Sequence, residues 1–161
     1  MQRLVLIVTA ACAAIISAAV LGGSSGAQQP GPPTGTLELV TLDRETRFKF
    51  VDNPPKRRER PGDLFMINAR VRDSSNRPTG RLHASFAETQ PPPRVVAQGS
   101  ATFILGNGQI MVSGLIVDQG RNDQTDTFAV VGGSGAYAAA RGTMVTTETR
   151  TRTRFVFTFA G

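Results

Sequence analysis

Residues 97–117 read AQGSATFILGNGQIMVSGLIV, two short apolar runs that are separated by Gly106-Asn107-Gly108. The runs are rich in Val, Ile, Phe and Thr, the residue types that favour β-strands. Gly and Asn accept the positive backbone angles of tight hairpin turns. We therefore predict a hairpin with strands over Ala97–Leu105 and Gln109–Val117.

The same pattern continues on both sides of this hairpin. From Thr36 onward no window of a dozen residues keeps a helical period of apolar positions, and DSSNRPTG (73–80) marks a second hairpin connection. The remaining predicted strands are Thr36–Leu42, Leu64–Arg72, Arg81–Glu88, Asp126–Val131, Gly142–Glu148 and Arg152–Phe159. Eight strands joined mostly by short turns predict an all-β fold, an eight-stranded antiparallel up-and-down β-barrel over residues 36–161, with a β-sandwich as the alternative. A closed barrel has no exposed edges, and a lumen of this size holds one small ligand.

Residues 1–27 have the order of a secretory signal peptide. Arg3 precedes an apolar run from Leu4 to Leu21, and Ser25-Gly26-Ala27 is a small-residue cleavage site. Residues 28–35 are rich in Pro and Gly, which predicts a flexible linker. We expect a secreted, extracellular protein with no stable membrane span after cleavage. An uncleaved membrane anchor and a lipoprotein attached through Cys12 are the alternatives.

The composition excludes several kinds of chemistry. The chain has 18 Lys and Arg against 12 Asp and Glu, for a formal net charge of +6, with one His and one Cys. Because Cys12 lies in the signal peptide, the mature chain has no thiol nucleophile, no disulfide and no Cys/His zinc site. We expect neither a metal nor a cofactor.

Three charged or glycine-rich motifs have ordinary explanations. The basic run 56–60 (KRRER) lies in the long segment 43–63. We expect Phe48 and Phe50 to pin the first half of this segment to the barrel as an extra strand piece, and we predict that the second half is an exposed loop. It has no interleaved aromatic residues, so we expect no nucleic acid partner. Arg150, Arg152 and Arg154 alternate along an outward face, and His83 lies on the surface.

The glycine-rich segment 132–137 (GGSGAY) superficially resembles a nucleotide-binding loop. No helix follows the glycines, as a dinucleotide fold requires, because another strand begins almost at once. We instead predict a tight corner in which the glycines adopt positive φ angles and Tyr137 packs over one end of the barrel.

The sequence also resembles a known family. The segments that carry the resemblance are GGSGAYAAARGTM (132–144), PGDLF (61–65), GNGQIMVSG (106–114) and the terminal FVFTFAG. Together they resemble the allene oxide cyclase-like and dirigent-like β-barrels over essentially the whole mature domain. The resemblance implies a barrel with an apolar lumen, a homotrimer, and a hydrophobic small molecule whose cyclisation or coupling the protein guides.

The resemblance also implies a set of lumen residues. The family glutamate falls on Glu38, which becomes the candidate catalytic residue: among apolar neighbours its pKa is expected to rise, so that it can donate a proton. The residues expected to point inward are Val40, Leu42, Phe65, Ile67, Ala69, Val71, Leu82, Ala84, Phe86, Ile110, Val112 and Ile116. The candidate ligand-binding residues among them are Val40, Ile67, Ala69, Phe86, Val112 and Ile116. The polar pocket residues of the plant cyclases are missing, which argues against plant-type cyclase activity. Glu88 shares the inward parity and is expected at a mouth.

Three classes of function remain open from the sequence. The first is a secreted barrel that binds a hydrophobic molecule and steers its cyclisation or coupling, as an isomerase-like enzyme or a dirigent-like protein. The second is a carrier that returns its ligand unchanged. The third is a structural barrel whose lumen is filled by side chains such as Phe65, Phe86 and Phe103.

Overall fold

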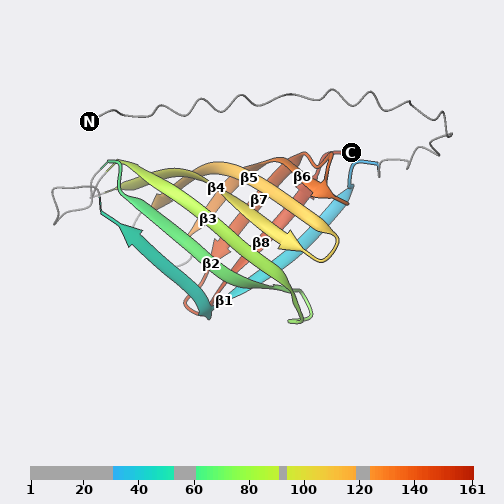
Figure 1. Ribbon diagram of the computed structural model, residues 1–161, viewed down its shortest axis with the longest axis horizontal. Coiled ribbons are helices and arrows are strands. Elements are labelled where there is room, and N and C mark those ends of the chain that lie inside the picture. The colour runs from blue at the N-terminus through green and yellow to red at the C-terminus, as the bar shows by residue number, and fades with distance from the viewer. Residues whose placement is uncertain (1–30, 53–60, 91–93, 119–123) are drawn as a thin grey trace, which may run out of the picture.

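The chain folds into a single closed antiparallel barrel in which every strand pairs with its neighbours in sequence and β1 closes on β8 (Figure 1). The computed structural model describes residues 31–52, 61–90, 94–118 and 124–161. The strands are β1 (Gly35–Val51), β2 (Leu64–Asp73), β3 (Pro78–Gln90), β4 (Val95–Leu105), β5 (Gly108–Asp118), β6 (Thr125–Gly135), β7 (Gly142–Glu148) and β8 (Arg152–Phe159). The predicted barrel and its eight strands are confirmed.

The hairpins that connect β4 to β5 and β2 to β3 form at the Gly, Asn and Asp residues that favour tight turns. Leu105 pairs with Gly108 around a two-residue turn, in which Gly108 has a φ of 149°. At the β2–β3 connection the Asp73 carboxylate accepts hydrogen bonds from the backbone N–H groups of Ser75 and Arg77, both at 2.9 Å. These local bonds set the register of the flanking strands.

One end of the barrel, where β1, β3, β5 and β7 begin, is packed solid; we call it the closed end. The ring of Phe103 meets those of Phe155 and Phe157 edge to face, with centroids 5.0 Å apart in both pairs. Tyr137 stacks on Phe159, with ring centroids 6.0 Å apart. Gly133 leaves room for Tyr137, because a Cβ at this position would lie 3.0 Å from the Tyr137 Cβ. The predicted glycine corner beneath Tyr137 is confirmed, with Gly135 at a φ of 59°.

A wide bulge interrupts β1. Thr41 pairs with Val71 and Thr46 pairs with Ala69, so residues 42–45 of β1 oppose the single residue Arg70 of β2. β1 therefore carries three extra residues, and an odd insertion reverses which side chains face the barrel interior. Before the bulge Leu39 and Thr41 are buried, and after it Thr46, Phe48 and Phe50 face the lumen.

The part of β1 before the bulge contradicts the predicted alternation. Glu38, Val40 and Leu42 were expected to point inward, but the buried positions of this half of β1 are Leu39 and Thr41. Val40 instead lies on the outer face, paired with Arg72 on one side and Arg154 on the other. Long arginine stems cover apolar surface well, which suits a half-buried valine outside the barrel.

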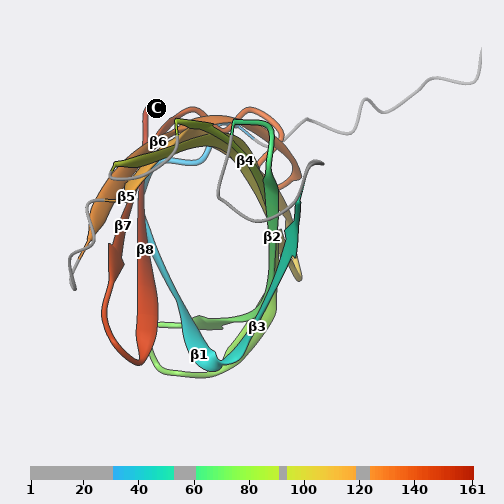
Figure 2. The same cartoon turned by 90° about the vertical axis from the view of Figure 1, so that its left-hand side faces the viewer.

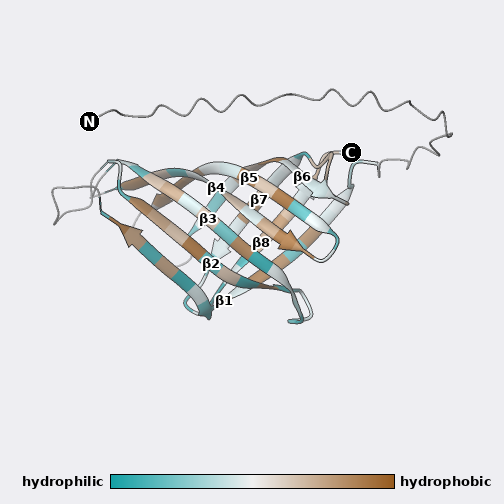
Figure 3. Ribbon diagram, in the orientation of Figure 1, coloured by the Kyte–Doolittle hydropathy of each residue, from teal (hydrophilic) through white to brown (hydrophobic). Residues whose placement is uncertain are grey.

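Hydrophilic and hydrophobic residues alternate along much of β1, β2 and β3 (Figure 3). His83, Arg152 and Arg154 are exposed, as predicted. The extra strand piece predicted in the first half of segment 43–63 is confirmed, because β1 continues through it to Val51. The basic run 56–60, the signal peptide and residues 28–30 of the linker lie outside the described residues.

The packed end generates a stability prediction. Phe157 is fully buried and touches two other rings, so Phe157→Ala is expected to lower the free energy of unfolding by about 3–5 kcal/mol. Thr158→Ala, on the exposed outer face of the same strand, serves as the control and should change it by no more than about 0.5 kcal/mol. Urea unfolding measures both, and equal losses would contradict the assignment of this end as the core.

Candidate functional site

The opposite end of the barrel, where β1, β3, β5 and β7 finish, contains a cavity of about 510 Å³; we call this the open end. Figure 2 looks into the ring of strands from this side. The floor of the cavity is formed by Phe103, Phe128, Met144 and Phe155, the last layer above the packed end. The barrel is thus filled at one end and hollow at the other, which overturns the fully filled alternative.

Two unlike walls rise from this floor. The wall built from β2 to β5, here the apolar wall, consists of Phe65, Ile67, Leu82, Ala84, Phe86, Val95, Ala97, Ala101 and Ile116. The wall built from β1 and β6 to β8 with Gln124, here the polar wall, consists of Thr41, Asp43, Thr46, Gln124, Asp126, Thr146, Glu148 and Thr153. A ligand enclosed between them is recognised by an apolar body on one side and polar groups on the other.

Asp126 is the most firmly held side chain of the polar wall. One carboxylate oxygen accepts the Val117 backbone N–H at 3.2 Å, and the other accepts a hydrogen bond from the Gln124 amide at 2.7 Å. Thr146 donates to the Asp126 carbonyl oxygen at 3.3 Å. The pairing of β5 with β6 ends at Gly114 and Phe128, so the Asp126 carboxylate satisfies an N–H beyond the end of this ladder. Its position is therefore set before any ligand arrives.

Glu88 places a carboxyl group near the top of the apolar wall. It lies on β3, lines the cavity and is only 3% exposed. Its backbone is fixed on both sides, since Glu88 N–H donates to the Asp63 carbonyl and the Glu88 carbonyl accepts the Gly62 N–H, each at 2.8 Å. The mouth position expected for Glu88 is confirmed, with the side chain inside rather than in solvent.

An aromatic row crosses the barrel at this level, formed by Phe50, Phe65, Phe86 and Phe128. Phe50 pairs with Phe65, and Phe65 with Phe86, in adjacent strands; the last two rings stack with centroids 5.3 Å apart. Phe86 and Phe128 meet edge to face at 6.1 Å across Gly99 and Gly114. A Cβ at either glycine would lie 2.8 Å from one of these rings, so both glycines make room for the aromatic row.

The bulge in β1 brings two further rings to the mouth. Phe48 and Phe50 line the cavity yet are 70% and 49% exposed, so they present apolar surface that a bound ligand would cover.

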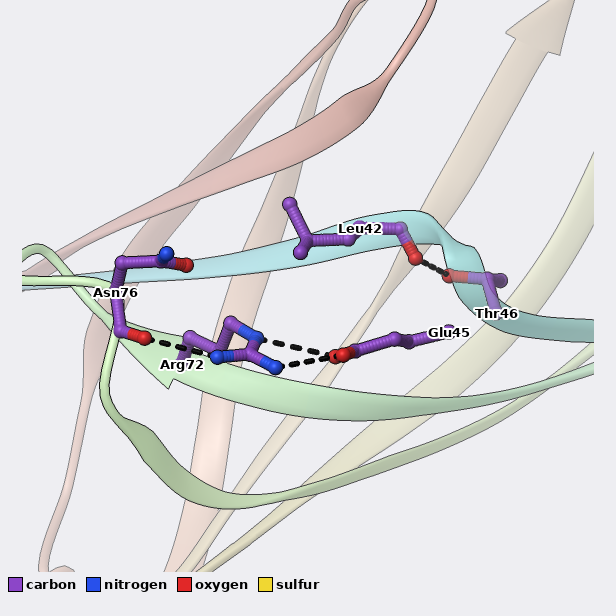
Figure 4. Close-up of polar contacts among 5 residues, drawn as sticks. All are labelled: Leu42, Glu45, Thr46, Arg72 and Asn76. Carbon is purple, nitrogen blue, oxygen red and sulfur yellow. Dashed lines mark hydrogen bonds and ion pairs between the residues drawn. The ribbon is translucent and has the colours of Figure 1, made fainter.

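Polar contacts hold the bulge in place (Figure 4). The Arg72 guanidinium donates hydrogen bonds to both carboxylate oxygens of Glu45, at 3.0 and 2.6 Å, and to the Asn76 carbonyl oxygen at 2.9 Å. Within the bulge, the Thr46 hydroxyl donates a hydrogen bond to the Leu42 carbonyl oxygen at 3.0 Å.

The six predicted ligand-binding residues separate into three groups. Ile67, Phe86 and Ile116 line the cavity. Ala69 and Val112 point inward as predicted but are buried in the packed part of the core, outside the cavity lining. Val40 faces outward, because the register of β1 differs from the one expected.

Glu38 lies outside the barrel, contrary to its predicted orientation. It accepts two hydrogen bonds from Arg154, at 2.7 and 2.6 Å, and does not line the cavity. The hydrogen bonds from Arg154 hold the pKa of Glu38 below its usual value, so the expected rise is also wrong. The structure therefore gives this carboxylate no access to a ligand in the lumen.

Sequence reasoning missed the polar wall. Asp126 shares the parity of the buried Phe128 and Val130, and Thr153 that of Phe155, so period-two alternation extended to the strand ends would have identified both.

Among the described residues, no group of three or more His, Cys, Asp or Glu could hold a metal ion. Nor does the described part of the chain contain a helix long and apolar enough to cross a membrane.

Comparisons with known proteins agree with this architecture. The profile of a family described as "Dirigent-like protein" matches residues 37–159. A search of curated proteins found no match.

Three similar solved structures illustrate the range of the fold. A pyocyanin demethylase is 20% identical with a TM-score of 0.65, covering 78% of this chain and 99% of its own. The Diels Alderase AbmU from Streptomyces koyangensis is 16% identical (TM-score 0.56), and the match covers 79% of this chain but only 63% of the enzyme. The pterocarpan synthase dirigent protein GePTS1 is 15% identical (0.56), covering 78% and 90%. At such identities these likenesses establish the fold alone.

The ion pair between Arg72 and Glu45 at the bulge predicts that the free energy of unfolding depends on pH. The hydrogen bonds from Arg72 lower the pKa of Glu45 below its ordinary value of 4.5, so the pair stabilises the folded state above that pH. Its contribution is lost as the pH falls through the lower pKa of the folded state. Glu45→Gln should therefore reduce the free energy of unfolding at neutral pH, and the difference from the wild type should vanish in acid.

Urea unfolding at a series of pH values measures this difference. Glu38→Gln is a matched control, because its ion pair with Arg154 is more exposed (35% and 49%, against 21% and 13% for Glu45 and Arg72) and should contribute less. A difference between Glu45→Gln and the wild type that is independent of pH would contradict the assignment.

Proposed function

The chain belongs to the dirigent-like protein family, and from this we propose that it binds a hydrophobic small molecule in the open-end cavity and steers its cyclisation or coupling. The observation that carries the proposal is the cavity itself. Its volume of about 510 Å³ lies within the range of about 300–1,000 Å³ that is usual for small-molecule sites. The proposal concerns a flexible substrate that must be held in one reactive conformation.

Shape supplies most of the effect in this mechanism. The apolar wall and the aromatic row hold the body of the substrate. The floor of the cavity is rigid, because the Phe103 ring packs edge to face against the rings of Phe155 and Phe157. Holding reacting atoms at close approach lowers the entropic part of the barrier without any covalent step. The polar wall supports the substrate's polar groups, with Asp126 and Glu88 positioned to accept a hydrogen bond or move a proton.

The names of the similar structures are consistent with this proposal. One of them is named as a Diels Alderase and another as a pterocarpan synthase dirigent protein. A carrier that releases its ligand unchanged is the alternative, and it uses the same cavity. Turnover therefore distinguishes the two functions, whereas binding does not.

Export to the cell exterior is part of the proposal. It is supported by the charged, apolar and small-residue order of residues 1–27. The homotrimer stays a prediction from the resemblance.

Filling the cavity tests whether it is the binding site. Ala84 lies in the apolar wall, so Ala84→Phe should weaken binding of 9-anthracenemethanol, followed by its fluorescence, by about tenfold or more. Ala129→Phe makes the same change on the exposed outer face of β6 and should leave affinity unaltered. Equal affinity in the wild type and Ala84→Phe would place the ligand elsewhere.

Steering is tested by stereochemistry. An achiral conjugated triene that closes to a chiral ring without catalysis should give one enantiomer in excess when the protein is saturating, and the Ala84→Phe variant should return the product to a racemate. Chiral chromatography measures the ratio. If a triene that is shown to bind still gives racemic product, the steering function is excluded and the carrier function remains.

A further inference from the structure

The cavity carries a charge opposite to that of the chain. Four carboxylates from four strands line it: Asp43 on β1, Glu88 on β3, Asp126 on β6 and Glu148 on β7. The described lining residues include no Arg, Lys or His, although the chain has 18 Lys and Arg against 12 Asp and Glu. Among the described residues, the charged side chains that line the cavity are therefore all acidic.

A second and independent feature concerns the body of the ligand. The aromatic row contributes rings from β1, β2, β3 and β6 to the cavity lining, and Phe48 adds an exposed ring at the mouth. Aromatic rings pack well against other rings, and their faces attract cations. The rings therefore favour an aromatic ligand, and they also favour a positive charge on it.

We propose that the ligand of this cavity is an aromatic molecule that carries a positively charged nitrogen. The proposal rests on the proposed function and specifies its substrate class. The aromatic body lies against the apolar wall and the aromatic row, and the charged nitrogen faces the polar wall, where Asp126 is held ready by Gln124 and Val117.

The basic residues on the outer surface do not cancel the preference of the cavity for a positively charged ligand. Arg72 and Arg154 are neutralised by ion pairs with Glu45 and Glu38 on the outside of the barrel. Exposed charges are screened by salt over about 8 Å at physiological ionic strength, whereas charges around an apolar cavity interact more strongly. An anionic ligand would instead bring a like charge among four carboxylates while losing its hydration.

A matched set of three probes tests the charge preference. The probes are 9-anthracenemethylamine, which is cationic at neutral pH, the neutral 9-anthracenemethanol, and the anionic 9-anthracenecarboxylate. They share one ring system, so differences in affinity report the substituent. Titration followed by anthracene fluorescence should show the amine binding about tenfold or more tightly than the alcohol, with the carboxylate weakest.

Variants identify the residues responsible. Asp126→Asn keeps an oxygen that can accept the Val117 N–H but removes the charge, and should weaken the amine about tenfold while changing the alcohol less than about twofold. Glu148→Gln tests a second carboxylate of the polar wall in the same way, and circular dichroism confirms that both variants are folded. Glu38→Gln removes a carboxylate from the outer face and is the control, which should retain the full preference.

The outcomes separate the two proposals. Equal affinity for all three probes, or tightest binding of the carboxylate, would overturn the cationic ligand and leave the proposed binding function standing. An amine preference that persists in both Asp126→Asn and Glu148→Gln would overturn the role of the polar wall. If no probe binds, the proposed function fails as well.

Discussion

The arrangement of the cavity depends on three extra residues in β1. Period-two alternation is a strict property of a strand, so an odd insertion exchanges the inner and outer faces for every residue beyond it. If residues 42–45 ran as regular strand with no bulge, Arg47 and Lys49 would face the lumen and Phe48 and Phe50 would face water. The insertion is held from outside the barrel, where Arg72 joins Glu45 to the Asn76 carbonyl and thus ties β1 to the β2–β3 turn.

The packed end makes the hollow end possible. Aromatic rings interlock around Phe103 and Phe157, and this layer closes the barrel at one end without relying on a ligand. Above it, Gly99 and Gly114 leave space that Phe86 and Phe128 occupy from neighbouring strands. Large and small residues thus complement one another around the barrel, and the remaining volume is concentrated at the open end, where the two walls differ in polarity.

Local patterns were sufficient for the strands and most of their faces. The family correspondence placed Ile67, Phe86 and Ile116 correctly in the lumen, because β2, β3 and β5 keep their alternation at these positions. The same reasoning failed for Glu38 and Val40. A family correspondence supplied their parity, while the pairing of β1 with β8 turns both to the outside. Asp126 was overlooked because a carboxylate at the start of a strand resembles an ordinary turn residue.

The sequence by itself determined the all-β architecture and the hairpin positions, since these depend on residues close together in the chain and on period-two alternation. Tertiary structure alone decided that carboxylates from β1, β3, β6 and β7 share one cavity, and that Glu38 reaches Arg154 instead. Neither result has a local signal, because closing the barrel sets the neighbours of each side chain through pairings between strands that are distant in sequence.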